Sequence, residues 1–256
     1  MLKRKRHTLK DQQKTEEHFR QIERNGREFV LPYLVAIYRG TKDKPEQVAT
    51  GFLLRCKSRR VFLTAKHSLY GEHGDVDPMT NMIFVNGELK FINELKSHRL
   101  KVDPDNDLVA LYVEEFPPKR AFPVESLCRT QEASALVTIL GYLARDFRRD
   151  RTGLHPGPYV YTNKARDHGH GYVGLLHPKS LNRDTESRTK VMAPKPSGLS
   201  GCPMLNSVKL LKGEVCIVGV FTDQRDGIAF GEASPKVLAL LSKLCGRAPR
   251  AKVAYF

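Results

Sequence analysis

The chain has 256 residues, of which 40% are hydrophobic, so it is long and apolar enough to fold and is not a disordered protein. Its 43 Lys and Arg residues against 28 Asp and Glu give a net charge of +15, which favours acidic partners. The basic residues are spread along the whole chain and do not alternate with aromatic residues. We therefore expect solvated basic loops, with nucleic acid not expected as the main ligand.

Residues 1–28 are almost entirely polar and are predicted to form a basic N-terminal extension. The run from Thr8 to Arg27 fits an exposed helix or a frayed tail, and a solvated extension is the preferred interpretation. The extension lacks the apolar stretch of a secretory signal, and no run reaches the roughly 18 apolar residues of a membrane span. These features predict a cytoplasmic protein without membrane contact.

The five cysteines form an odd set with no C-x-x-C pair, which argues against a disulfide framework and against a structural zinc site. This pattern favours a reducing, intracellular setting. His168 and His170 are spaced so that both imidazoles of an extended strand would share one face, with His155 and His177 nearby. A polar hairpin is the preferred interpretation, so no metal and no other cofactor is expected.

From Phe29 onward, short apolar runs alternate with Gly, Pro, Asn and Asp, which is typical of a β-barrel or sandwich. The lack of β-α-β alternation argues against a doubly wound sheet. Ser234 suits a helix N-cap, Pro235 the first helical position and Gly246 the stop, so a helix is predicted over 234–246. The sequence thus predicts an all-β domain over 29–256 that closes with a C-terminal helix.

Residues 198–203, Gly-Leu-Ser-Gly-Cys-Pro, place Ser200 between glycines. Such glycines let the chain expose a hydroxyl and aim successive N–H groups into one concavity, which is what the oxyanion of an acyl transfer requires. An ordinary turn is one alternative. Another is the elbow of an α/β-hydrolase, but that motif needs Gly two positions after Ser, where Cys202 stands.

Two further residues are the partners that a nucleophilic serine needs. His67 follows an apolar run over 61–65, and His is the commonest general base for activating a hydroxyl. Asp107 precedes an apolar run over 108–113, where a carboxylate beside an imidazole would orient the ring. Each residue taken alone is an ordinary polar loop residue, so only their combination with Ser200 indicates a catalytic site.

The order His67, Asp107, Ser200 is that of chymotrypsin-type enzymes, and the sequence resembles the trypsin-like serine protease family. Three segments carry the resemblance to its T-A-x-H, D-[IL]-A-L-L and G-[DN]-S-G-G-P motifs: residues 64–67, 107–111 and 198–203. Residues 139–142 resemble the strand that opens the second barrel of the family, and 215–222 the strand along its specificity pocket. The resemblance covers about residues 29–246.

The resemblance implies two six-stranded antiparallel β-barrels with a catalytic triad between them. The first barrel would cover 29–125, the second 126–233, and the C-terminal helix 234–246. It also implies hydrolysis of a protein or peptide substrate through an acyl-enzyme, with His67 as base, Asp107 as its orienting group and Ser200 as nucleophile. The N–H groups of Gly198 and Ser200 would form the oxyanion hole.

Three positions depart from the secreted members of the family. Leu199 replaces the Asp that pairs with a new N-terminus after activation, Cys202 replaces a Gly, and Ser68 replaces a half-cystine. These changes resemble intracellular bacterial relatives. They leave open whether an activating protein partner or residues 1–28 must order the oxyanion loop, or whether the loop is always formed.

The resemblance places the substrate pocket between Pro194 and Lys195 on one side and Thr222 and Asp223 on the other. Lys195 would favour an acidic substrate side chain, whereas Asp223 offers a second route to a basic one. The alternative function is a catalytically silent protein-binding module. Its basic loops at 145–151 and 179–195 would contact nucleic acid.

Overall fold

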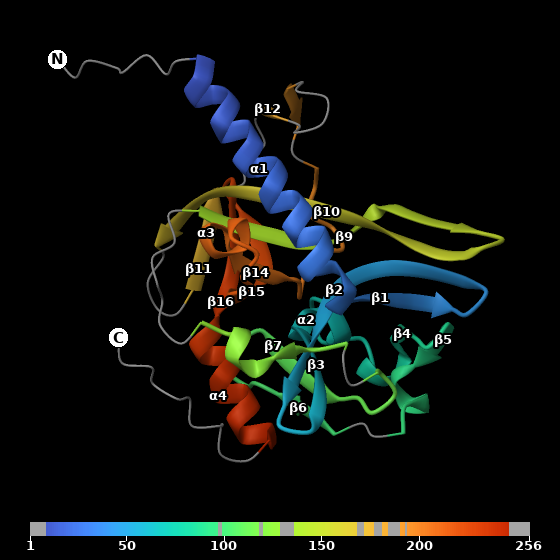
Figure 1. The fold of residues 1–256 in the computed structure, drawn as a ribbon. Coiled ribbons are helices and arrows are strands. Elements are labelled where there is room, and N and C mark those ends of the chain that lie inside the picture. Colours follow the sequence, from blue (N-terminus) through green and yellow to red (C-terminus); the bar gives the residue numbers. More distant parts are fainter. Residues whose placement is uncertain are drawn as a thin grey trace.

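The computed structural model describes residues 9–96, 99–117, 120–128, 136–167, 172–176, 181–183, 190–192 and 194–245. Strands dominate the described chain, as expected, and they form two bodies with a helix at each end of the sequence (Figure 1). His168, His170 and His177 lie outside the described residues, as do Gly246 and most of the basic loop at 179–195.

An eight-stranded sheet forms the first half of the chain. Its strands are β1 (Leu34–Thr41), β2 (Lys44–Cys56), β3 (Arg59–Ala65), β4 (Met82–Val85), β5 (Glu88–Phe91), β6 (Leu100–Val102), β7 (Leu108–Tyr112) and β8 (Phe122–Pro123). They run in the order β5-β4-β1-β2-β3-β7-β6, with β8 parallel to β2. The end strands β5 and β6 have only four and three residues and do not pair with each other. The described hydrogen bonds therefore leave this sheet open where a closed six-stranded barrel was expected.

The second half forms the closed six-stranded barrel that the sequence predicts. Its strands are β9 (Leu136–Asp150), β10 (Gly153–Asp167), β11 (Tyr172–Leu176), β14 (Pro203–Asn206), β15 (Ile217–Arg225) and β16 (Ile228–Ala233). They close in the order β10-β11-β16-β15-β14-β9, and every pairing is antiparallel. The short strands β12 (Leu181–Arg183) and β13 (Lys190–Met192) pair only with each other.

Helices fill the connections and both ends of the described chain. The α-helices are α1 (Leu9–Phe29), α2 (Lys66–Tyr70), α3 (Ser207–Leu211) and α4 (Ser234–Cys245), and the 3-10 turns are η1 (Leu31–Tyr33), η2 (Pro78–Thr80), η3 (Ile92–Glu94) and η4 (Val124–Ser126). The α4 helix confirms the predicted C-terminal helix and buries the apolar face of Val237, Leu240, Leu241 and Leu244. No helix in the described ranges has the length and apolar character to cross a membrane.

The α1 helix differs from the solvated extension that the sequence favoured. Its last turns pack on the second half of the chain, where Ile22 is 3% exposed and Asn25 is 5% exposed. The Asn25 amide donates hydrogen bonds to the backbone oxygens of Leu210 and Leu211, at the end of α3. The Leu210 oxygen also accepts the Gly213 N–H at 3.0 Å, so the Asn25 amide adds a second hydrogen bond there and ties α1 to the end of α3.

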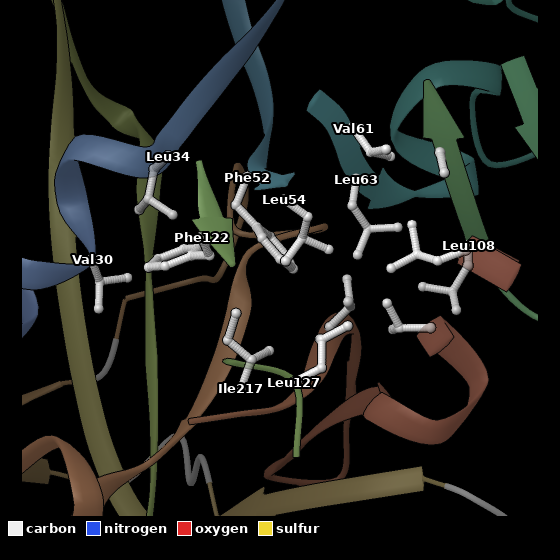
Figure 2. Close-up of a cluster of buried hydrophobic side chains, with 14 of the residues drawn as sticks. Val30, Leu34, Phe52, Leu54, Val61, Leu63, Leu108, Phe122, Leu127 and Ile217 are labelled. Carbon is white, nitrogen blue, oxygen red and sulfur yellow. The ribbon is translucent and has the colours of Figure 1, made fainter. Parts of the chain in front are cut away.

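A buried apolar cluster joins the two halves. Figure 2 shows Phe52 and Leu54 of β2 facing Leu127 and Ile217, which come from the second half of the chain. The side chains of α4 belong to the same cluster. Since interiors pack at crystal-like density, this cluster holds the sheet and the barrel in one fixed relation.

The expectation of unpaired cysteines was wrong in one respect, because Cys128 and Cys216 form a disulfide with a Cα–Cα distance of 5.8 Å. The two residues lie 88 positions apart, in a connection and before a strand, and no local motif signals such a pairing. Disulfides persist in oxidising compartments, so this pair removes the cysteine argument for a reducing setting.

Thiol titration tests the pairing. Cys56 and Cys202 are buried, burial raises the pKa of both thiols, and Cys245 is the partly exposed free cysteine. We expect the folded protein to react fast with a disulfide reagent at Cys245 alone. The unreduced unfolded chain should show three thiols and the reduced chain all five. Five thiols before reduction would contradict the disulfide.

Candidate active site

Strand pairing brings His67 and Asp107 together. β3 and β7 are antiparallel neighbours, with Ala65 opposite Leu108, so the end of β3 lies beside the start of β7. His67 follows Ala65 by two residues, in the first turn of α2, and Asp107 directly precedes Leu108. The Lys66 N–H donates to the Asp107 backbone oxygen at 3.2 Å, which holds the two connections in register.

Both oxygens of Asp107 bind His67. Asp107 Oδ2 lies 2.6 Å from His67 Nδ1, and Asp107 Oδ1 accepts the backbone N–H of His67 at 3.0 Å. A carboxylate accepts hydrogen bonds, so this contact places the ring proton of neutral His67 on Nδ1. The Nε2 atom then carries the free lone pair and can take a proton, as a general base requires.

The largely buried Glu232–Lys236 ion pair contacts the backbone of Asp107. The Asp107 N–H donates to Glu232 Oε1 at 3.2 Å, and Glu232 Oε2 pairs with Lys236 Nζ at 2.7 Å. The Glu232 side chain is 3% exposed and that of Lys236 20% exposed, and the Lys236 ammonium lies 3.8 Å from the ring centroid of Tyr172. The sequence carries no signal for this role of Glu232, because no local motif links it to a residue 125 positions away.

Ser200 lies in a tight turn that only glycine allows at two positions. Gly198 and Gly201 have φ of +94° and +88°, in the left-handed region that favours glycine. A Cβ atom on Gly201 would lie 2.0 Å from Thr64 Oγ1 and 2.2 Å from the Thr50 backbone oxygen. The glycines that marked the motif therefore let the turn pack directly against the first sheet.

Two backbone N–H groups in this turn have no acceptor among the described residues. In the described chain, the N–H groups of Gly198 and Ser200 donate to no protein atom. The carbonyls of the same two peptides are held, since Ser197 O accepts from Ala144 N at 3.0 Å and Leu199 O from Cys202 N at 2.9 Å. Because a trans peptide directs its N–H opposite to its C=O, both free N–H groups point away from these partners.

One cleft of about 380 Å³ brings most of the predicted site residues together. Those that line it are His67, Lys195, Gly198, Ser200, Thr222 and Asp223. In the described residues, no hydrogen bond joins the Ser200 hydroxyl to the His67 ring, a contact that is often long before substrate binds. Pro194 does not line the cleft, whereas Arg39 and Glu72, which carry no sequence motif, do.

The charged side chains of the cleft differ in their partners. Asp223 Oδ2 binds Arg225 Nε at 2.5 Å, and Asp223 Oδ1 accepts the Gln224 N–H at 2.6 Å. The exposed Lys195 has no ion pair in the part of the chain that the structure describes. Of these two charges, the positive one is therefore the more available to a ligand.

The described residues near Ser200 support neither a cysteine nucleophile nor a metal site. Cys202 is fully buried and burial raises the pKa of its thiol, so it is an inert neighbour and not a second nucleophile. No group of three or more His, Cys, Asp or Glu side chains suited to a metal occurs within the described ranges. His155 instead contacts Asp150 and Thr152 at the tip of the β9–β10 hairpin.

Solved structures resemble this fold, while no protein-family model and no curated protein matches the sequence. A thermostable serine protease, AL20, from an extremophilic microorganism has a TM-score of 0.53 at 13% identity, over 84% of this chain and 98% of that one. A mutant of human heparin binding protein has 0.51 at 15% identity, over 87% and 95%. Catalytically inactive tobacco etch virus protease, complexed with substrate, has 0.50 at 10% identity, over 83% and 85%. At these identities the likeness concerns the fold, and the closed barrel, second sheet and C-terminal helix are consistent with a chymotrypsin-like fold.

The Glu232–Lys236 pair yields a stability prediction. Lys236→Met leaves a buried carboxylate without its cation, so the free energy of unfolding should fall by about 3 kcal/mol in urea denaturation. Lys243→Met, at an exposed position of the same helix, is the matched control and should change it by less than about 0.5 kcal/mol. Equal losses for the two variants would contradict the role of the pair.

Proposed function

We propose that this chain is a serine endopeptidase that cleaves a protein or peptide substrate through a triad of His67, Asp107 and Ser200. One observation carries the proposal: both carboxylate oxygens of Asp107 bind His67, and His67 and Ser200 line the same cleft. The chymotrypsin-like fold of serine proteases such as AL20 supports the same function.

In the proposed reaction, His67 Nε2 takes the Ser200 proton as Oγ attacks the substrate carbonyl carbon. The tetrahedral intermediate then collapses when His67 returns that proton to the leaving amine, which leaves an acyl group on Ser200. Water, activated by His67 in the same way, hydrolyses the ester and frees the enzyme. Asp107 fixes the ring and stabilises its protonated form throughout.

The N–H groups of Gly198 and Ser200 would bind the oxyanion. Their lack of an acceptor supports this role, since preorganised donors need no rearrangement when charge develops on the carbonyl oxygen. Of the two alternatives that the sequence left open, these hydrogen bonds favour a loop that is always formed. An activating partner is then not required.

The proposed substrate pocket runs between Lys195, with Pro194 preceding it, and the β15 residues Thr222 and Asp223. Since Arg225 binds the Asp223 carboxylate and Lys195 has no ion pair in the described chain, the pocket favours an acidic substrate side chain. A basic side chain would have to displace Arg225 from Asp223.

Covalent labelling tests the function. A fluorophosphonate probe should label the purified parent protein and leave Ser200→Ala unlabelled, because only an activated serine attacks it. His67→Ala should lower the labelling rate on the order of 10⁴-fold. A folded parent protein that takes no label would contradict the proposal and favour the silent binding module.

Charge reversal tests the pocket. Lys195→Glu should lower kcat/KM about 3-fold or more for peptides with Glu at the cleaved position and raise it for peptides with Lys there, since exposed ion pairs contribute about 0.2–1 kcal/mol. The difference should shrink in high salt. Lys212→Glu, an exposed lysine after α3, controls for net charge. Identical substrate preferences in the two variants would show that Lys195 does not contribute to the pocket.

A further inference from the structure

Thr50 of β2 lies fully buried where the first sheet meets the Ser200 turn. Its backbone N–H does not serve the sheet but donates to the Ser200 oxygen at 3.0 Å. Its hydroxyl donates to the Gly198 oxygen at 2.7 Å and accepts the N–H of Tyr142, in β9, at 3.0 Å. One residue of the first half of the chain thus binds three backbone groups of the second.

These bonds complete the restraint of the Ser200 turn. The four consecutive carbonyls of residues 197–200 each accept a hydrogen bond, from Ala144 N, Thr50 Oγ1, Cys202 N and Thr50 N in that order. Two of the four donors belong to Thr50. Rotation of any of these peptides would break such a bond inside a buried site, where an unpaired carbonyl costs about 1–3 kcal/mol.

Among the N–H groups of residues 198–201, paired and unpaired groups alternate in the described chain. Leu199 N donates to the Pro196 oxygen and Gly201 N to the Phe221 oxygen, while those of Gly198 and Ser200 stay without an acceptor in the described chain. The Thr50 hydroxyl holds the peptide that joins Gly198 to Leu199, which lies between the two peptides that present these N–H groups. It therefore acts on the oxyanion site through this neighbouring peptide, without touching the substrate.

The side chain of Leu199 makes this restraint necessary. It is 1% exposed and belongs to the apolar interior of the closed barrel, so it anchors the turn by packing alone. Packing is not directional and leaves the peptide orientations free, whereas hydrogen bonds to the carbonyls set them. An acidic residue at this position could form a salt bridge, which Leu199 cannot.

We propose that Thr50 is a positioning residue whose hydroxyl fixes the Gly198 carbonyl, so that the Gly198 and Ser200 N–H groups are ready for an oxyanion in the free chain. The proposal rests on the proposed function for its catalytic consequence. The restraint itself depends only on the bonds around Thr50. The two parts can therefore be tested by separate measurements on the same full-length variants.

Three substitutions isolate the hydroxyl. Thr50→Val keeps the shape and removes the hydroxyl, and Thr50→Ala and Thr50→Ser both lose the methyl group and differ only in the hydroxyl. Thr138→Val is the matched control, because Thr138 is equally buried and bonds Thr162 and Ser207, in the barrel. If Val proves too disruptive to fold, the Ala and Ser pair still gives the comparison.

The catalytic measurement is the second-order rate of fluorophosphonate labelling, in which the phosphoryl oxygen occupies the oxyanion site. We expect the rate to fall about 10- to 100-fold in the Val and Ala variants, less than the roughly 10²- to 10³-fold loss when an oxyanion donor is removed outright. The Ser and Thr138→Val variants should stay within about 3-fold of the parent. Val and Ala variants that label as fast as Ser would overturn the proposal.

The structural measurement is amide hydrogen exchange in the peptide that spans 194–203. Exchange should be faster in the Val and Ala variants than in the parent, and unchanged in Ser and in Thr138→Val. Unchanged exchange in all variants would overturn the restraint. A parent protein that takes no label but shows this exchange pattern would remove the proposed function and leave the restraint supported.

Discussion

The apolar cluster that joins the two halves is the constraint on which the candidate site depends. His67 and Asp107 belong to the open sheet, and Ser200 belongs to the turn that enters the closed barrel. The relative positions of His67 and Ser200 are therefore set by the packing of the cluster that contains Phe52, Leu127 and Ile217 (Figure 2). A tightly packed apolar cluster prevents the two halves from sliding past each other, because any shift would open voids in it.

Hydrogen bonds between the two halves fix orientations that the apolar packing leaves free. Asp107 reaches Glu232 across 125 residues of sequence, and Thr50 reaches Gly198 across 148. Each bond joins the sheet to the barrel at a point directly behind a site residue. The two contacts therefore convert a nondirectional apolar interface into one with a defined geometry at Asp107 and at the Ser200 turn.

The sequence predicted the parts of the site that carry local signals. His67 and Asp107 each stand beside an apolar strand and Ser200 between glycines, and the signals of Ser234 and Pro235 for the start of α4 are likewise local. Glu232 and Thr50 have no such signal, since their roles arise only when distant strands meet. The open first sheet was also beyond prediction, because apolar runs show where strands lie and not whether short end strands pair. The docking of α1 involves Ile22 and Asn25, in a helix that otherwise has the composition of a solvated one.

The Cys128–Cys216 bond has a consequence for the unfolded chain. It closes a loop of 88 residues that contains Ser200 and two of the residues that hold its turn, Ala144 and Cys202. Loop closure of this size lowers the conformational entropy of the unfolded state and contributes roughly 4–5 kcal/mol to stability. That amount is a large fraction of the stability of an ordinary domain. Reduction would thus destabilise the half that carries Ser200 while leaving the sheet with His67 and Asp107 without a covalent change, so the stability of the second half would depend on the redox state of its surroundings.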